Sequence, residues 1–301
     1  MKISDFLSRE EIAYFSRKSD FHAWRLLLAN WLAIIAIFVV VAQYPNPLTI
    51  AIALLLIAGR QLGLSVLMHE CGHRCLFKTS RLNDFMGQWF CALPVMNDLP
   101  SYARGHLGHH RHAGTREDPD LGNYQAYPIS RASFKRKVIR DLTGQTGIKM
   151  LARIARGAGN AMSREKRKSA KPFLQALAVQ AIMALVLAAM GYAWLYLVWI
   201  GAYLTTFMLI IRLRQVAEHA AVPDLYDLDP RKNTRTTIAR WWERLILAPN
   251  GVNYHMEHHF MASVPCYKLK EMHQHLLDKQ VLADTPECIG YAAVLRQAVV
   301  A

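Results

Sequence analysis

The chain has 301 residues, of which 53% are hydrophobic, and it carries a formal net charge of +14. Its hydrophobic residues are concentrated in a few long runs, a distribution that is typical of a membrane protein and excludes an ordinary soluble globule. The basic charge suits an anionic membrane face or an acidic protein partner, and in a membrane protein we expect no nucleic-acid partner. The five cysteines show no paired CxxC spacing, which predicts reduced thiols and no disulfide framework.

The N-terminal segment, residues 1–22, is predicted to form an amphipathic helix on the membrane surface. Ser8 and Glu11 have the spacing of a capping box, and nearby aromatic and aliphatic residues supply an apolar side. The first apolar run begins only near Trp24, after this charged stretch and without a small-residue cleavage site. We therefore expect no cleavable signal peptide and interpret the run as a membrane span.

Four apolar runs have the length that a helix needs to cross a bilayer. Two prolines, Pro45 and Pro47, mark a turn inside the first pair, and little more than Gly191 separates the second pair. The spans are predicted at about residues 24–44, 48–68, 172–190 and 192–211. The sequence thus predicts a single domain over residues 1–301, an all-α membrane protein with four transmembrane helices in two hairpins.

The distribution of Lys and Arg predicts the orientation of these spans. The tight turns at 44–48 and 190–192 contain neither residue, whereas the remaining polar segments carry essentially all of them. By the positive-inside bias, residues 1–22, 70–171 and 212–301 are predicted to be cytoplasmic. We therefore expect a multi-pass protein of the cytoplasmic (inner) membrane with both termini in the cytoplasm.

Two segments between the hairpins are expected to lie at the membrane surface. Residues 85–96 are apolar but too short to span, which suits an interfacial or re-entrant helix. Residues 131–171 are rich in Arg and Lys with interspersed aliphatic residues. This pattern suits an anionic lipid face or an acidic partner, and a merely solvated basic helix is the alternative.

One arginine lies inside a predicted span. Arg60 either marks the point where the second helix leaves the hydrocarbon or binds a substrate carboxylate or phosphate as a head-group residue. Arg212 and Arg214 occupy a comparable place near the end of the fourth run. The first interpretation has helices two and four projecting beyond the membrane, with arginines at the interface.

Nine of the 13 histidines have the spacing of metal ligands. Spacings of i, i+3 and i+4 place side chains on one face of a helix, so that each cluster directs its imidazoles at one spot. They are His69 and His73 in HECGH, His106, His109 and His110 in HLGHH, His255, His258 and His259 in HMEHH, and the isolated His219. Nine imidazoles exceed the needs of one tetrahedral zinc and suit two ions of higher coordination number.

The other four histidines lack such support. We expect His22, His273 and His275 to be surface residues. His112 is either a residue that supports the metal ligands or one that faces solvent.

With these motifs, the sequence resembles the integral-membrane fatty acid desaturase and hydroxylase family of histidine-box diiron membrane oxidases. HECGH, HLGHH and NYHMEHH correspond to its three histidine boxes, and the resemblance runs from the first span to about residue 280. It implies two iron ions, dioxygen as co-substrate, and a four-helix membrane stem under a cytoplasmic helical cap that holds the dimetal site. His219 matches an additional histidine of the family. Gln215 stands where some members have an asparagine that binds metal through water, so it is a candidate for that role.

Five carboxylates lie beside the histidines in the sequence. We predict that they orient imidazole N–H groups and do not bind metal themselves. They are Glu70, Glu218, Glu257, Asp118 and Asp120.

The electrons are expected to come from outside the chain, because it has no cytochrome b5 motif, paired-CxxC rubredoxin motif or dinucleotide-binding GxGxxG. We predict a ferredoxin- or rubredoxin-like donor that docks on the basic cytoplasmic surface.

The predicted activity is the oxygen-dependent desaturation of a fatty acyl chain, an oxidoreductase reaction that the NYHMEHH form favours. A hydroxylase, ketolase or decarboxylating oxidase of a fatty acid or other lipid is the alternative on the same scaffold. A membrane zinc metallopeptidase could use HECGH with Glu70 as general base, but it leaves both HxxHH clusters unexplained. A metal transporter is disfavoured because transport sites usually lie near the bilayer midplane.

Overall fold

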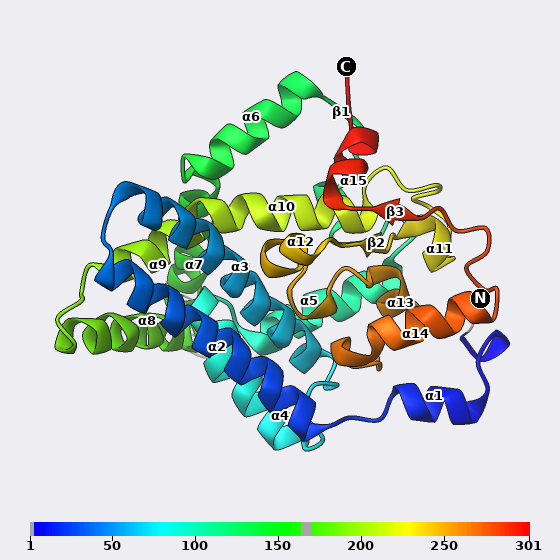
Figure 1. Cartoon of the computed structure of the whole chain (residues 1–301), viewed down its shortest axis with the longest axis horizontal. Helices are drawn as coiled ribbons and strands as arrows, with labels where there is room; N and C mark the ends of the chain where they lie inside the picture. The colour runs from blue at the N-terminus through cyan, green and yellow to red at the C-terminus, as the bar shows by residue number, and fades with distance from the viewer. Residues whose placement is uncertain (1–2, 164–169) are drawn as a thin grey trace.

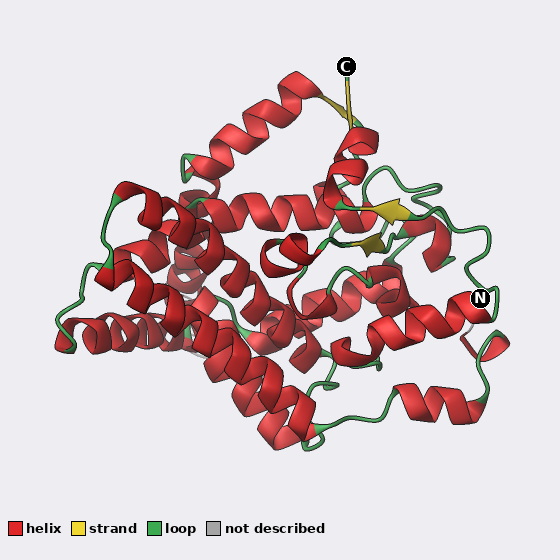
Figure 2. Ribbon diagram, viewed as in Figure 1, coloured by secondary structure: helices red, strands yellow, loops and turns green. Residues whose placement is uncertain are grey.

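The computed structural model describes residues 3–163 and 170–301, and most of this part of the chain is helical (Figure 2). Long helices pack together on one side of the molecule, and short helices gather at their other end (Figure 1). The tips of both hairpins lie on the left of this view and the N-terminus on the right. We refer to the long helices as the stem and to the short helices at their other end as the cap.

The N-terminal helix is shorter than predicted. After a single turn, η1 (Ile3–Asp5), helix α1 covers only Arg9–Phe15. Its predicted capping box is confirmed, because the Ser8 hydroxyl accepts from the backbone of Glu11 and the Glu11 carboxylate accepts from the backbone of Ser8. Glu11 also accepts from Lys279 Nζ at 2.7 Å, which holds α1 against the end of α14 (Cys266–Asp278).

The first hairpin consists of α2 (Asp20–Gln43) and α3 (Pro47–Gly72). Asn46 caps α3 by accepting from the backbone N–H groups of Leu48 and Thr49, and Pro47 begins the helix where its missing N–H is harmless. Both helices are long and apolar enough to cross a membrane. Each extends past its predicted span, and α3 continues to the first histidine motif.

The second hairpin differs from the prediction in its second arm. Helix α8 (Lys171–Ala189) agrees with the third predicted span, and Gly191 has a φ of +83° in the turn that follows. The fourth span is divided into α9 (Leu195–Leu204) and α10 (Thr206–His219). Thr205 Oγ1 donates to the Gly201 carbonyl at 2.6 Å, and Thr206 Oγ1 donates to Leu54 on α3 at 2.7 Å. Such side-chain bonds to backbone carbonyls compete with the helical ladder and account for the break.

The segment between the hairpins is helical. The predicted interfacial stretch at 85–96 forms the end of α4 (Ser80–Met86), a π-helical turn η2 (Gly87–Ala92) and η3 (Leu93–Val95). Helix α5 (Leu99–His112), the turn η4 (Leu121–Asn123), α6 (Arg131–Leu142) and α7 (Gln145–Ser163) follow. The predicted basic segment therefore forms two helices, and its residues 164–169 lie outside the described part of the chain.

The C-terminal third builds the rest of the cap. Its helices are α11 (Pro230–Asn233), α12 (Trp241–Ile246), η6 (Pro249–Gly251), α13 (His255–Phe260), α14 and α15 (Tyr291–Ala298). Two short parallel pairs, β1 (Ile129–Ser130) with β4 (Val299–Val300) and β2 (Thr237–Ile238) with β3 (Cys288–Ile289), tie the chain end to earlier segments.

A continuous apolar core joins stem and cap. It lies between α3, α9 and α10, with Ile57, Leu62 and Trp199 almost completely buried. Arg60 joins α3 to the cap, because its guanidinium donates to the backbone carbonyl of Leu245 on α12 at 2.5 Å. The Arg60 guanidinium is thus bonded to another part of the protein.

Candidate metal centre

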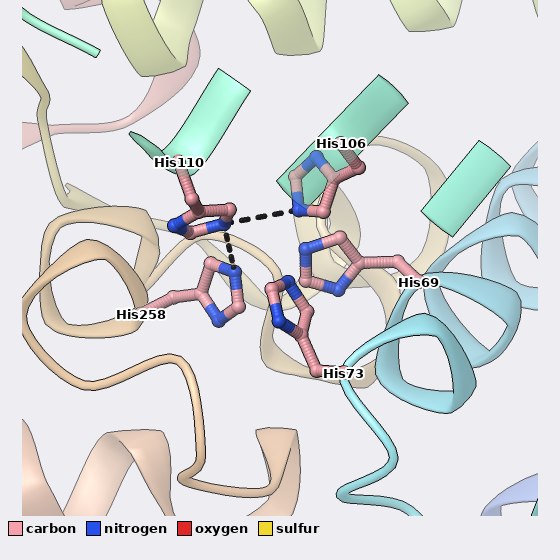
Figure 3. Close-up of side chains that lie close together, drawn as sticks. All are labelled: His69, His73, His106, His110 and His258. Atoms are coloured by element: carbon pink, nitrogen blue, oxygen red, sulfur yellow. Dashed lines mark hydrogen bonds between the residues drawn. The ribbon is translucent and has the colours of Figure 1, made fainter. Parts of the chain in front are cut away.

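The nine predicted histidines form two groups in space. In each group the ligand nitrogens lie within 4.8 Å of one another. The first group is His69, His73, His106, His110 and His258, and the second is His109, His219, His255 and His259. Figure 3 shows the rings of the first group converging from α3, α5 and α13. The structure thus brings together every histidine that the sequence predicted as a metal ligand.

The two HxxHH motifs explain how two groups arise from a few helices. Residues four apart share a helix face, whereas a residue three positions along projects to its side. On α5, His106 and His110 join the first group and His109 joins the second. On α13 the assignment is reversed, because His255 and His259 join the second group and His258 joins the first. Each of these two helices therefore contributes to both groups.

The remaining ligand candidates come from the ends of the long helices. His69 lies in the last turn of α3, and His73 is the residue that caps it. His219 is the last residue of α10. Since α3 and α10 pack in the rigid apolar core, these three residues are held in fixed positions relative to α5 and α13.

The nitrogens inside each group meet one another at short distances. His110 Nε2 lies 3.0 Å from His106 Nε2 and 2.9 Å from His258 Nε2. The Nε2 atoms of His69 and His73 are buried and have no hydrogen-bond partner among the described residues. Because buried polar atoms without a partner are costly, converging unpaired nitrogens indicate a site that a cation completes. Imidazole suits iron, zinc and copper, so this donor set fits the expected iron ions.

The surroundings keep these imidazoles in the neutral form that binds metal. Burial lowers the pKa of His73 to about 3, and His69 contributes to the shift. Burial likewise lowers the pKa of His110 to about 2, with His73 as the next cause. The pKa values of His106, His258 and His259 are also lowered, chiefly by burial. At neutral pH their nitrogen lone pairs are therefore available to a metal.

Three of the five predicted carboxylates contact ligand histidines. His69 Nδ1 donates to Glu70 at 3.0 Å, and His109 Nδ1 donates to Asp118 at 2.8 Å. Glu218 Oε1 lies 3.5 Å from His255 Nδ1. The partner of His219 Nδ1 is the backbone carbonyl of Asn233 at 3.3 Å, which sequence did not indicate. These contacts at Nδ1 leave Nε2 of each ring directed at its group.

Glu257 is placed differently from the prediction. Its side chain is fully buried and accepts a hydrogen bond from the Thr236 hydroxyl and another, at 2.7 Å, from His273 Nδ1. It therefore contacts no imidazole of either group. The expectation that His273 is a surface residue is wrong, because its side chain is only 12% exposed. His273 lies four residues after Leu269 and three before Leu276, and this helical spacing to two apolar residues is the signal that could have suggested it.

Asp120 also departs from the prediction. Its backbone N–H donates to Asp118 Oδ1 at 2.9 Å, but its carboxylate makes no hydrogen bond with any described residue. It lines a cavity next to the metal centre, as does Gln215, whose side-chain amide likewise has no partner among the described residues. Gln215 is thus near the second group, and its water-mediated role stays a prediction.

The other predicted residues lie outside both groups. His275 Nε2 donates to Glu11 at 2.7 Å, and the ring of His22 stacks on Tyr267 with centroids 5.0 Å apart. His112 ends α5 without joining either group. Arg60 does not line the cavity next to the metal centre.

That cavity has a volume of about 650 Å³. His106, His109, His219 and His255 form part of its wall. Apolar side chains from α7, α8 and α10 form another part, among them Met150, Phe173, Phe207 and Ile211. A ligand in this cavity therefore touches both apolar groups and the candidate ligands of the metal centre.

Comparisons with known proteins agree with this geometry. The chain is 28% identical over 233 residues to dihydrorhizobitoxine desaturase of Bradyrhizobium elkanii, a match that covers 72% of this chain and 65% of that protein. The chain therefore matches slightly less than two thirds of that relative's length. The family model described as fatty acid desaturase matches residues 45–287. This range includes all nine histidines and the apolar helices α3, α8, α9 and α10, but not α2. The chain belongs to the fatty acid desaturase family.

Proposed function

We propose that the protein is a membrane diiron desaturase that introduces a carbon–carbon double bond into the hydrocarbon chain of a lipid-like substrate. The observation that carries this proposal is the pair of histidine groups that share α5 and α13 and border one cavity. In the reaction, adjacent methylene groups each lose a hydrogen atom. Dioxygen takes up these hydrogens together with two electrons and two protons from outside, and two molecules of water form.

The iron ions would supply the strong oxidant that an unactivated C–H bond requires and that side chains cannot provide. His69, His73, His106, His110 and His258 would hold one ion, and His109, His219, His255 and His259 the other. Glu70, Asp118 and Glu218 orient the imidazoles, which is what second partners of metal-binding histidines commonly do. The apolar wall of the cavity positions the chain and excludes water.

The geometry argues against a zinc peptidase. A general base must be free to accept a proton from water, but both oxygens of Glu70 are occupied. Oε1 accepts from His69, and Oε2 accepts from the backbone N–H of Cys266 at 2.7 Å. His69 and His73 also join histidines from two other helices, so they are not the core of a separate HExxH site.

We further propose that both termini and the cap lie in the cytoplasm, at the inner membrane. The absence of Lys and Arg from both hairpin turns supports this orientation. Electrons would come from a ferredoxin- or rubredoxin-like protein, for which the exposed Arg131, Lys135, Arg136 and Arg140 on α6 offer a basic surface.

The experiment that tests the proposal is mass spectrometry of lipid and polar extracts from cells that express the chain. His255→Ala removes a ligand, whereas His112→Ala removes a histidine outside both groups. A new unsaturated product is expected with the native chain and with His112→Ala but not with His255→Ala. A hydroxylated or shortened product would show that the reaction is hydroxylation or chain cleavage and not desaturation. Purified protein that holds zinc without iron would overturn the diiron assignment.

A further inference from the structure

The cavity wall carries an arginine that is only half satisfied. Arg214 Nε donates to Glu218 Oε1, one helical turn further along α10, at 2.6 Å, which fixes the Arg214 side chain. Its two terminal nitrogens make no hydrogen bond with any described residue, although the side chain is only 14% exposed. The sequence placed Arg214 at the membrane interface, but it lines the cavity. Its unpaired edge has the geometry that binds a carboxylate through two parallel hydrogen bonds.

A carboxylate without a partner faces the same cavity. Asp120 lies in the loop after α5 and makes no ion pair with any described residue. Burial is the main cause that raises the pKa of Asp120; the neighbouring Asp118 raises it further, and the charges of His109 and Arg214 lower it. Asp120 and Arg214 line the same cavity, and they make no ion pair with each other, because Arg214 is paired with Glu218. A half-buried carboxylate without an ion-pair partner is stabilised by a ligand that brings a positive charge.

Two neutral polar groups complete this part of the wall. The Tyr102 hydroxyl and the Gln215 amide also line the cavity and have no hydrogen-bond partner among the described residues. The Tyr102 ring is fixed by stacking on His106, with centroids 5.3 Å apart. A cavity built for an alkyl chain alone would not present the unpartnered side chains of Asp120, Tyr102 and Gln215 together with the free terminal nitrogens of Arg214, since an apolar ligand would cover them without replacing their hydrogen bonds to water.

We propose that the substrate carries both a carboxylate and an ammonium group, as an amino acid does, with Arg214 binding the carboxylate and Asp120 the ammonium. The inference rests on the proposed function and specifies its substrate class. A simple fatty acid would pair with Arg214 and leave Asp120 desolvated, and a neutral ester or thioester would pair with neither. A zwitterionic head group satisfies both residues at once.

The test is calorimetric binding to purified iron-loaded protein of three probes that share one carbon chain. Norleucine carries both charges, hexanoate lacks the ammonium, and pentylamine lacks the carboxylate. Norleucine is expected to bind at least about tenfold more tightly than either of the others, the equivalent of one well-placed charged contact. Equal binding of hexanoate and norleucine would overturn the proposal without any variant.

Asp120→Asn removes the negative charge while preserving the shape of the side chain and its backbone hydrogen bond to Asp118. The preference for norleucine over hexanoate should fall about tenfold or more in this variant. Glu117→Gln removes an exposed carboxylate of the same loop, and the preference should be unchanged. A preference retained in Asp120→Asn at native iron content would contradict the role of Asp120.

Product analysis separates this inference from the proposed function. Unsaturated amino acids in the polar extract would support both. Unsaturated acyl lipids without amino acid products would support the desaturase and overturn the substrate class. Norleucine binding with the expected preferences, but without any oxygen-dependent product, would support the head-group site and overturn the desaturase.

Discussion

At the scale of single residues, the carboxylates fix the direction in which the imidazole nitrogens point. Glu70 contacts three segments at once: His69 beside it, the backbone of Cys266 at the start of α14, and the Cys75 thiol at 3.3 Å. It therefore orients a ligand and also joins the end of α3 to the cap. A charged acceptor with several donors is worth more than a neutral one in the same place.

This arrangement predicts the effect of Glu70→Gln. The amide keeps the shape but loses the charge and presents an N–H₂ group to one of its donors, so His69 loses its fixed orientation. Iron affinity should fall by roughly 10–100-fold, as for other partners of metal-binding histidines. Iron content after dialysis against a chelator measures this. Glu117→Gln is the control, and native iron retention in Glu70→Gln would contradict the orienting role.

The buried histidines also predict how the metal-free protein responds to pH. The pKa values of His73 and His110 are lowered to about 3 and about 2, whereas in the unfolded chain each lies near its ordinary value of 6.5. Between these limits the unfolded state binds more protons, so the free energy of unfolding decreases as pH falls below 6.5. Each of these two histidines contributes up to about 1.4 kcal/mol per pH unit to this decrease in the free energy of unfolding.

Thermal unfolding of the metal-free protein in detergent, between about pH 5 and pH 8, measures this dependence. The midpoint should decrease toward acidic pH, and His73→Gln should make the decrease shallower because one proton fewer is taken up on unfolding. A midpoint that is constant over this range would show that these imidazoles are already protonated in the folded protein.

At the scale of elements, close approach of helices places the cap on the stem. Helix α12 lies so near α3 that a Cβ atom on Gly59 would be 2.7 Å from the Leu245 carbonyl oxygen and 3.0 Å from Ile246 Cα. The Leu245 carbonyl also accepts from Arg60. The absence of a side chain at residue 59 thus permits the hydrogen bond that the adjacent arginine makes.

Gly59→Ala should therefore destabilise the protein, because backbone atoms of α12 must move. The expected cost is about 1–3 kcal/mol, as for other overpacked positions, measured as a lower midpoint of thermal unfolding. Gly201→Ala is the matched control, since its Cβ would meet only the flexible end of Leu54 at 3.4 Å. Equal midpoints for the two variants would contradict the steric account.

The prediction from sequence succeeded where local patterns suffice. Apolar length identified the four segments that are long and apolar enough to cross a membrane, and residue spacing identified the nine histidines that the structure gathers into two groups, because both patterns are local. The break at Thr205, the hydrogen bond from His273 to Glu257 and the cavity position of Arg214 depend on contacts between distant segments. A sequence pattern contains no signal for Thr206 bonding to Leu54, or for Glu257 lying opposite His273. Those features follow only once the helices are packed.

At the scale of the whole molecule, the positive charge has a defined place relative to the metal centre. Asp141 on α6 accepts from Arg212 Nε at 2.5 Å, and the Asp141 side chain is completely buried. This pair fixes the basic helix α6 to α10, the helix that ends at His219. An acidic electron donor docked on α6 would thus be coupled through one rigid helix to the candidate metal ligands.

Reversing the charge of Lys135 and Arg136, both exposed on α6, should slow reduction by an acidic ferredoxin roughly tenfold or more at low ionic strength. Added salt should slow the native protein in the same way, since screening weakens the attraction. Stopped-flow reduction of the iron-loaded protein measures both effects. Reversal of Arg9 and Arg17 is the control, because these exposed residues lie in and beside α1, far from α6 (Figure 1). If the reduction rate is insensitive to salt and to the α6 charges, the donor docks elsewhere, and the basic face of α6 is better explained by contact with anionic lipid.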